Sequence, residues 1–214
     1  MLLPGARSQN QRDLYYDNSG TITTGGTAQI LLPERKSCSF LFIQNISDTE
    51  QYIKFGGAKA TAVLTSGVVT SVTMNDKGFN YSLPPTVQFL GGGGKSGWNY
   101  NDGRFVGCTL PGWPTPDDIA TGQAVLASAS PLPGSFVNSI TVGHGGSGYL
   151  TAPYVFIADN FNDPNGCATP SATSGVELNA GGGSWASNGT TCSTDPIAIY
   201  CATTGKAFTC LWLP

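Results

Sequence analysis

Residues 137–157 read VNSITVGHGGSGYLTAPYVFI, and residues 69–89 read VTSVTMNDKGFNYSLPPTVQF. The two stretches align without a gap at an offset of 68 residues, the separation of Tyr81 and Tyr149 (149 − 81). An internal repeat of this kind indicates two copies of one supersecondary unit. The identical positions in the first copy are Val69, Ser71, Thr73, Gly78, Tyr81, Pro85 and Val87.

The repeat extends upstream, where AVLTS (62–66) matches AVLAS (124–128) once a six-residue insertion around residues 131–134 is allowed. The two copies therefore span about residues 62–90 and 124–157. Each copy reads as a strand, a turn, a second strand, a Gly-x-x-Tyr loop and a strand that follows a proline.

Three residues of each copy predict a structural corner. Glycine permits a positive φ, tyrosine covers the corner with its ring, and proline precedes a strand where no ladder donor is needed. These predicted corner residues are Gly78, Tyr81 and Pro85 in the first copy, and Gly146, Tyr149 and Pro153 in the second.

The rest of the chain also favours β-structure. Short β-branched and aromatic runs alternate with turn residues, and helical periodicity is nearly absent. Residues 27–33 and 37–47 read as strands, the second buried on both faces, and 52–55 reads as its hairpin partner. A C-terminal hairpin around Gly205-Lys206 would place Cys201 opposite Cys210.

Composition narrows the functional classes. The chain has 214 residues, only 11% of them charged, and a net charge of −3. Scattered basic residues give no footprint for nucleic acid or an anionic membrane. So few charges make a poorly soluble free monomer, which favours a protein that works within an assembly. The N-terminal MLLPGARS lacks the apolar run of a secretory signal, so we expect synthesis in a reducing cytosol and six unpaired, buried thiols.

No motif predicts catalysis, a cofactor or a metal. The single histidine, His144, aligns with Asp76 and reads as a polar turn residue. LGGGGKSGW (90–98) lacks the Walker spacing of a nucleotide-binding loop, and DNFNDPNG (159–166) lacks the EF-hand spacing of a calcium site. The acid pair Asp117-Asp118 suits the first turn of a short helix, where the helix dipole explains it without catalysis. We therefore expect no enzyme.

Aromatic residues in the loops between the repeats are the candidate interaction surface. They suit either stacking on sugars or packing against a neighbouring subunit, and interface statistics favour the subunit contact. These residues are Trp98, Tyr100, Phe105 and Trp113.

The two ends of the chain resemble small tailed-bacteriophage virion proteins. Residues 18–61 carry a Gly-Gly-Thr-Ala-Gln strand, a strand ending in Gln-Asn and one ending in Phe-Gly-x-Ala. SGVELNAGGGSW (174–185) and PIAIYCATTGKAFTCLW (196–212) resemble the closing half, with Ala180 where proline would be usual. The repeats likewise resemble β-rich units of phage fibre, tail and head-surface proteins.

The resemblance implies an all-β protein with a discontinuous, jelly-roll-like β-sandwich base, formed by residues 18–61 and 174–214. Residues 62–173 would be an inserted β-repeat domain, and residues 1–17 an extended N-terminal arm. Fold constrains role only loosely.

The same resemblance implies a role in the virion, after assembly in the host cytoplasm. The expected function is a capsid decoration or cement protein, with the major capsid protein or other virion proteins as partners and a trimeric or dimeric homo-oligomer. The alternative is a head fibre, tail-fibre adaptor or receptor-binding module that binds a host surface glycan.

Overall fold

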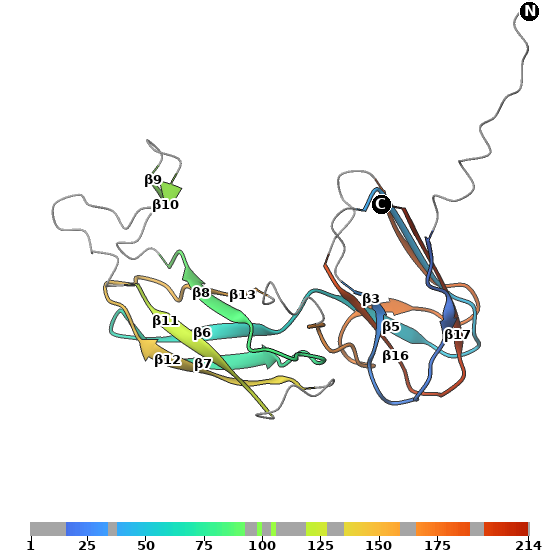
Figure 1. The fold of residues 1–214 in the computed structure, drawn as a ribbon, viewed down its shortest axis with the longest axis horizontal. Helices are drawn as coiled ribbons and strands as arrows, with labels where there is room; N and C mark the ends of the chain where they lie inside the picture. The colour runs from blue at the N-terminus through green and yellow to red at the C-terminus, as the bar shows by residue number, and fades with distance from the viewer. Residues whose placement is uncertain are drawn as a thin grey trace, which may run out of the picture. The chain divides into compact units, whose positions relative to one another are not determined.

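The computed structural model describes residues 16–33, 38–92, 98–99, 104–105, 119–127, 135–158, 166–188 and 195–213. Every regular element within these ranges is a β-strand, which confirms the all-β prediction. The chain forms two compact units: a base unit of residues 1–55 and 170–214, and an inserted unit of residues 56–169. In Figure 1 the base unit carries both ends of the colour scale, whereas the inserted unit runs from cyan through green and yellow to light orange.

The unit boundaries differ from the predicted ones by a few residues. The predicted boundary after residue 61 would cut β6 (Lys59–Thr65), which pairs along its length with β7 (Val68–Asp76) of the inserted unit. The chain instead leaves the base unit after β5 (Gln51–Phe55). It re-enters the base unit at residue 170 rather than 174, before β14 (Val176–Leu178).

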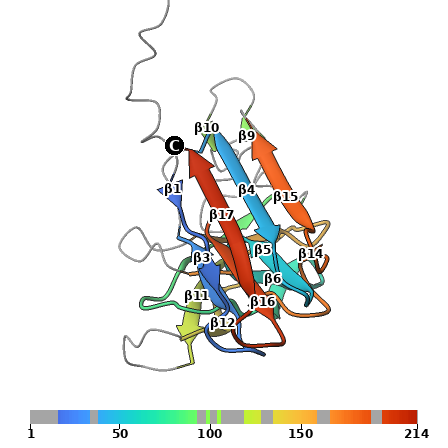
Figure 2. The same cartoon turned by 90° about the vertical axis from the view of Figure 1, so that its right-hand side faces the viewer.

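The base unit contains two antiparallel sheets. In the first, β17 pairs on one side with β1 and β2 and on the other with β4, and β4 pairs with β15. Figure 2 shows β17, β4 and β15 side by side. The second sheet has the order β14-β5-β16-β3. The remaining bounds are β1 (Tyr16–Asp17), β2 (Gly20–Thr21), β3 (Gln29–Leu32), β4 (Phe40–Asn45), β15 (Ser184–Asn188), β16 (Ile197–Cys201) and β17 (Ala207–Leu213).

These pairings are those of a jelly roll. With β1 and β2 counted as one interrupted strand, the first strand of the base pairs with the last, the second with the seventh, the third with the sixth and the fourth with the fifth. Successive pairs alternate between the two sheets, as when one long hairpin is rolled up into an eight-stranded jelly roll. The insertion interrupts the β5–β14 connection, which is the tip of that hairpin.

Alternating residues of both sheets form one apolar core. In β4, Leu41, Ile43 and Asn45 are buried, while the residues between them are half-buried. The prediction of a strand buried on both faces was therefore right for one face only. The core includes residues of β16 in one sheet and of β17 in the other: Ile197, Ile199, Cys201, Phe208 and Cys210.

Both predicted hairpins of the base unit are wrong. Strand β5 pairs with β14 and β16, not with β4, and β17 pairs with β4, not with β16. The turns at 46–50 and 202–206 carry the chain from one sheet to the other, because a jelly roll places consecutive strands in opposite sheets. Cys201 and Cys210 are consequently buried thiols that enter the core from opposite sheets.

A buried amide joins two turns of the base unit. Asn45 is fully buried, and its Nδ2 lies 2.8 Å from the carbonyl oxygen of Thr49 and 2.9 Å from that of Leu178. Its Oδ1 accepts hydrogen bonds from the backbone nitrogen and hydroxyl of Ser47. The Gln-Asn ending of this strand therefore fixes the β4–β5 turn against the β14–β15 connection.

Two further expectations for the base unit are corrected. Cys38 is disulfide-bonded, so the prediction of six unpaired thiols is wrong at this residue. Cys108 and Cys192 lie outside the described residues. The predicted arm of residues 1–17 extends two residues too far, because Tyr16 and Asp17 pair with Trp212 and Leu211 as strand β1.

The inserted unit is built from interlocked copies of the repeat. The first copy supplies β6, β7 and β8 (Thr86–Leu90), and the second supplies β11 (Thr121–Leu126), β12 (Val137–His144) and β13 (Tyr154–Ala158). Each copy begins with a hairpin, β6–β7 or β11–β12. Strand β13 leaves its own copy and pairs with β6 and β8 of the other, giving a sheet of order β7-β6-β13-β8. The short strands β9 (Trp98–Asn99) and β10 (Arg104–Phe105) form a separate pair.

Candidate functional site

The two predicted corners have the same internal geometry. The hydroxyl oxygen of Tyr81 accepts a hydrogen bond from the backbone nitrogen of Ala58 at 2.7 Å, and that of Tyr149 accepts one from Ala120 at 2.9 Å. Both tyrosines are buried. Gly78 and Gly146 have φ of 60° and 62°, as the corner requires, and Pro85 and Pro153 are buried. Each tyrosine thus links its corner to a backbone amide of a distant segment.

The corners also bind the two copies to each other. The backbone nitrogen of Tyr81 donates to the carbonyl oxygen of Ser135 in the second copy. In return, the nitrogen of Tyr149 donates to the carbonyl oxygen of Gly67 in the first. Since Ser135 and Gly67 are equivalent positions of the repeat, the two hydrogen bonds are related by an approximate two-fold axis.

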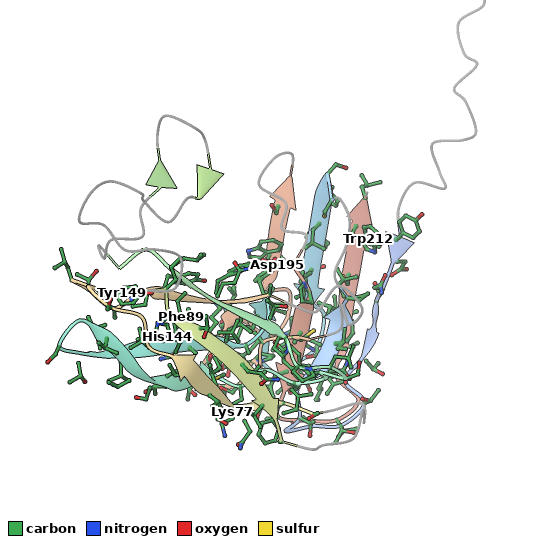
Figure 3. The ribbon with its side chains drawn as sticks, turned by 60° about the vertical axis from the view of Figure 1, so that its left-hand side comes forward. Lys77, Phe89, His144, Tyr149, Asp195 and Trp212 are labelled. Carbon is green, nitrogen blue, oxygen red and sulfur yellow. The ribbon has the colours of Figure 1, made fainter. Side chains whose placement is uncertain are left out.

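His144 and Asp76 occupy equivalent positions, but the structure gives them different surroundings. Asp76 Oδ1 accepts a hydrogen bond from the backbone nitrogen of Gly78 at 2.8 Å, and its carboxylate also accepts one from Thr169. It therefore caps the first corner. His144 is exposed at the end of β12, opposite Thr121 (Figure 3). An exposed imidazole at a strand end suits the predicted turn role.

The described part of the chain contains no group of three His, Cys, Asp or Glu side chains arranged to hold a metal ion. Within the same ranges, no helix is long and apolar enough to cross a membrane. Residues 159–165 of the acidic loop, Asp117-Asp118 and residues 93–97 of the glycine-rich loop lie outside the described residues.

The predicted interaction surface is described only in part. Trp98 and Phe105 are register partners in the β9–β10 pair. Tyr100 and Trp113 lie outside the described residues.

A second aromatic pair, which the sequence analysis missed, lies on β13. Tyr154 is 65% exposed and Phe156 is 40% exposed, while Val155 between them is buried. Alternation along the strand therefore directs both rings to the outer face of the β7-β6-β13-β8 sheet. The signal was present in the repeat itself, because the equivalent residues of the first copy are Thr86 and Gln88.

Polar side chains flank this aromatic pair on both neighbouring strands, together with the apolar side chain of Leu90, the register partner of Tyr154 on β8. Tyr154 is the register partner of Thr61 on β6, and Thr61 is the partner of Thr73 on β7. On the other side of β13, Phe156 is the partner of Gln88. The Thr61 hydroxyl also donates to Asn75 Oδ1 at 2.8 Å. We call Tyr154, Phe156, Thr61, Thr73 and Gln88 the β13 face.

The described residues with a shifted pKa belong to the base unit, whereas the β13 face belongs to the inserted unit. The hydrogen bond from Lys206 lowers the pKa of the Asp48 carboxyl, assisted by the hydroxyl of Thr49. Desolvation raises the pKa of Tyr52, and the carboxylates of Glu177 and Glu50 raise it further. The Asp48 shift therefore follows from contacts of the β4–β5 turn, and the Tyr52 shift from desolvation and the carboxylates beside it.

Comparisons with protein-family models, with curated proteins and with solved structures find no match to this chain.

Proposed function

We propose that this chain is a structural protein of a bacteriophage virion, and specifically a decoration protein that binds the head shell through its base unit. The observation that carries the proposal is the pairing order of the base unit, in which β1 and β2 pair with β17, β3 with β16, β4 with β15 and β5 with β14. Jelly rolls of this order recur in viral capsid proteins and in lectins. The resemblance of residues 18–61 and 174–212 to phage virion proteins favours the viral use.

The low charge content and the exposed apolar side chains also support a protein that works within an assembly. Charged residues make up 11% of the chain, well below the roughly 25% of an ordinary domain. Three large apolar side chains are exposed in the described part of the base unit, namely Tyr16 at 52%, Ile46 at 54% and Val176 at 41%. Burial of such side chains against a shell or a second copy contributes about 25 cal/mol per Å² before the cost of association.

The test compares virions with and without this chain. Virions that lack it should release their DNA at a lower temperature, and purified full-length chain added to them should restore heat resistance. DNA release is followed with an intercalating dye, and adsorption to host cells is measured on the same samples. Normal heat resistance combined with lost adsorption would replace this proposal with a host-recognition role.

A further inference from the structure

The two copies of the repeat provide an internal control for the role of each exposed side chain. Several equivalent positions carry the same residue in both copies and are buried in both. They are the pairs Ala62 and Ala124, Val69 and Val137, and Tyr81 and Tyr149. Residues that the fold requires are therefore retained at equivalent places.

The β13 face departs from this rule. Tyr154 and Phe156 replace Thr86 and Gln88, so the same position of the same strand accepts a small polar residue in the first copy. The fold therefore does not require aromatic side chains at positions 154 and 156. Exposed aromatic rings also cost solubility, which leaves contact with another molecule as the reason for their presence.

The residues around the rings indicate an uncharged partner. Threonine hydroxyls and the Gln88 amide flank Tyr154 and Phe156, and these groups both donate and accept hydrogen bonds. The one exposed charged side chain on the adjacent strands β6 and β8 is Lys59 at the start of β6. A highly charged ligand would find little to pair with on this face.

The stretch of sheet beside the two rings is smaller than a standard protein interface. Four strands about 4.8 Å apart, over the five residues of β13 at about 3.4 Å each, cover about 240 Å². A stable protein–protein interface needs about 800 Å² per partner. A face of this size instead suits a chain of a few sugar units.

We propose that the β13 face binds an uncharged oligosaccharide. Tyr154 and Phe156 are two residues apart on one strand, so their rings are spaced by about 7 Å. The C–H faces of successive pyranose rings pack on such a pair, because aromatic faces carry a negative quadrupole and a large apolar area. Thr61, Thr73 and Gln88 hydrogen-bond the ring hydroxyls at the edges.

This binding activity goes beyond attachment to a head shell and does not rest on it. The sugar site belongs to the inserted unit, whereas the proposed attachment belongs to the base unit. A chain that stabilises heads but binds no sugar keeps the proposed function and loses this one. A chain that binds sugar but does not stabilise heads keeps the sugar-binding proposal and loses the proposed function.

The experiment is calorimetric titration of the full chain with four uncharged hexasaccharides: cellohexaose, maltohexaose, mannohexaose and chitohexaose. The test variant carries Tyr154→Thr and Phe156→Gln, which restore the residues of the first copy and so preserve the fold. We expect the wild-type chain to bind at least one of the four and the double variant to bind it at least about tenfold more weakly.

Two controls separate the β13 face from general stickiness. Val125→Thr removes an apolar side chain that is 41% exposed on β11, close to the 40% of Phe156, and should leave sugar affinity unchanged. Hyaluronan hexasaccharide, which is anionic, should bind no better than the best neutral sugar. Absence of binding to all four neutral sugars, or equal binding by the double variant with unchanged thermal unfolding, would overturn the proposal.

Discussion

Gln88 and Phe156 are register partners in the β8–β13 ladder, and they are also equivalent residues of the two repeats, 68 positions apart (156 − 88). A residue can pair with its own equivalent only where a two-fold axis crosses the ladder. The flanking pair of Thr86 with Ala158 and that of Leu90 with Tyr154 obey the same relation. The inserted unit is therefore organised like a symmetric dimer fused into one chain, in which the third strand of the second copy pairs with the first copy.

This symmetry predicts equal effects of equivalent mutations. Tyr81→Phe and Tyr149→Phe each leave one buried backbone N–H, that of Ala58 or of Ala120, without its acceptor. We expect each to lower the free energy of unfolding by about 1–3 kcal/mol. Tyr154→Phe, at an exposed hydroxyl, should change it by less than about 0.5 kcal/mol. Urea denaturation measures all three, and a cost confined to one buried tyrosine would contradict the symmetric arrangement.

The corner could be predicted from sequence because its requirements are local. A positive φ at Gly78 and Gly146, a covering ring and a proline before the next strand all lie within eight residues of one another, and the duplication displays them twice. The all-β class followed from the same short-range signals.

The pairing of the base strands could not be predicted in this way. The stretch from β16 to β17 has the alternation and the glycine turn of a hairpin, with Gly205 at φ 79°, yet it connects opposite sheets. Alternation reports only that one face is buried. Whether the next strand pairs with the preceding one or lies across the core from it is decided by contacts between residues far apart in the sequence, such as Cys210 and Ile43, which are 167 residues apart (210 − 43). The exposure of Tyr154 and Phe156 could not be predicted, because the sequence does not show which face of β13 is buried. In the structure Val155 is buried, so its two aromatic neighbours lie on the exposed face.

The buried amide of Asn45 gives a second prediction. Asn45→Ala removes the donor shared by the carbonyl oxygens of Thr49 and Leu178, in a site that water does not reach. The free energy of unfolding should fall by about 2–4 kcal/mol. Gln44→Ala is the matched control, since half-buried Gln44 makes a 3.2 Å hydrogen bond to Gly182; its cost should stay below about 1 kcal/mol. Equal costs at both positions would argue against the role of Asn45.

The disulfide of Cys38 predicts a redox-dependent stability. Cys38→Ser should lower the free energy of unfolding by about 2–4 kcal/mol, and a reducing agent should lower that of the wild type by a similar amount. The variant should then be insensitive to the reducing agent. We expect non-reducing peptide mapping to join Cys38 to Cys192, because Cys192 follows β15, which pairs with β4 just after Cys38. A Cys38–Cys108 peptide would show the partner to be wrong.

The Asp48–Lys206 ion pair predicts a pH effect. The folded-state pKa of Asp48 is lowered from its ordinary 3.8, mainly by the hydrogen bond from Lys206. Its contribution to stability is therefore present above the unfolded pKa and is lost as pH falls through the folded value. Carboxyl NMR titration should show the Asp48 midpoint rising toward 3.8 in Lys206→Gln. Lys54→Gln, at a lysine that donates to Ser174, should leave the midpoint unchanged.

Removal of the insertion tests whether the jelly roll is complete without it. Ile53 lies opposite Val176, and Lys54 Nζ donates to Ser174 Oγ at 2.7 Å, so β5 and β14 already have the spacing of a hairpin. The deletion replaces residues 56–173, which are the inserted unit and the four base-unit residues that follow it, with Asn-Gly. We expect this chain to fold, because a two-residue turn of this type suits antiparallel strands. Its thermal unfolding should be a single cooperative transition, and the same deletion carrying Asn45→Ala should unfold at a lower temperature. Because the base core contains only base-unit residues, an aggregated or non-cooperative deletion chain would mean that the insertion supplies part of the fold.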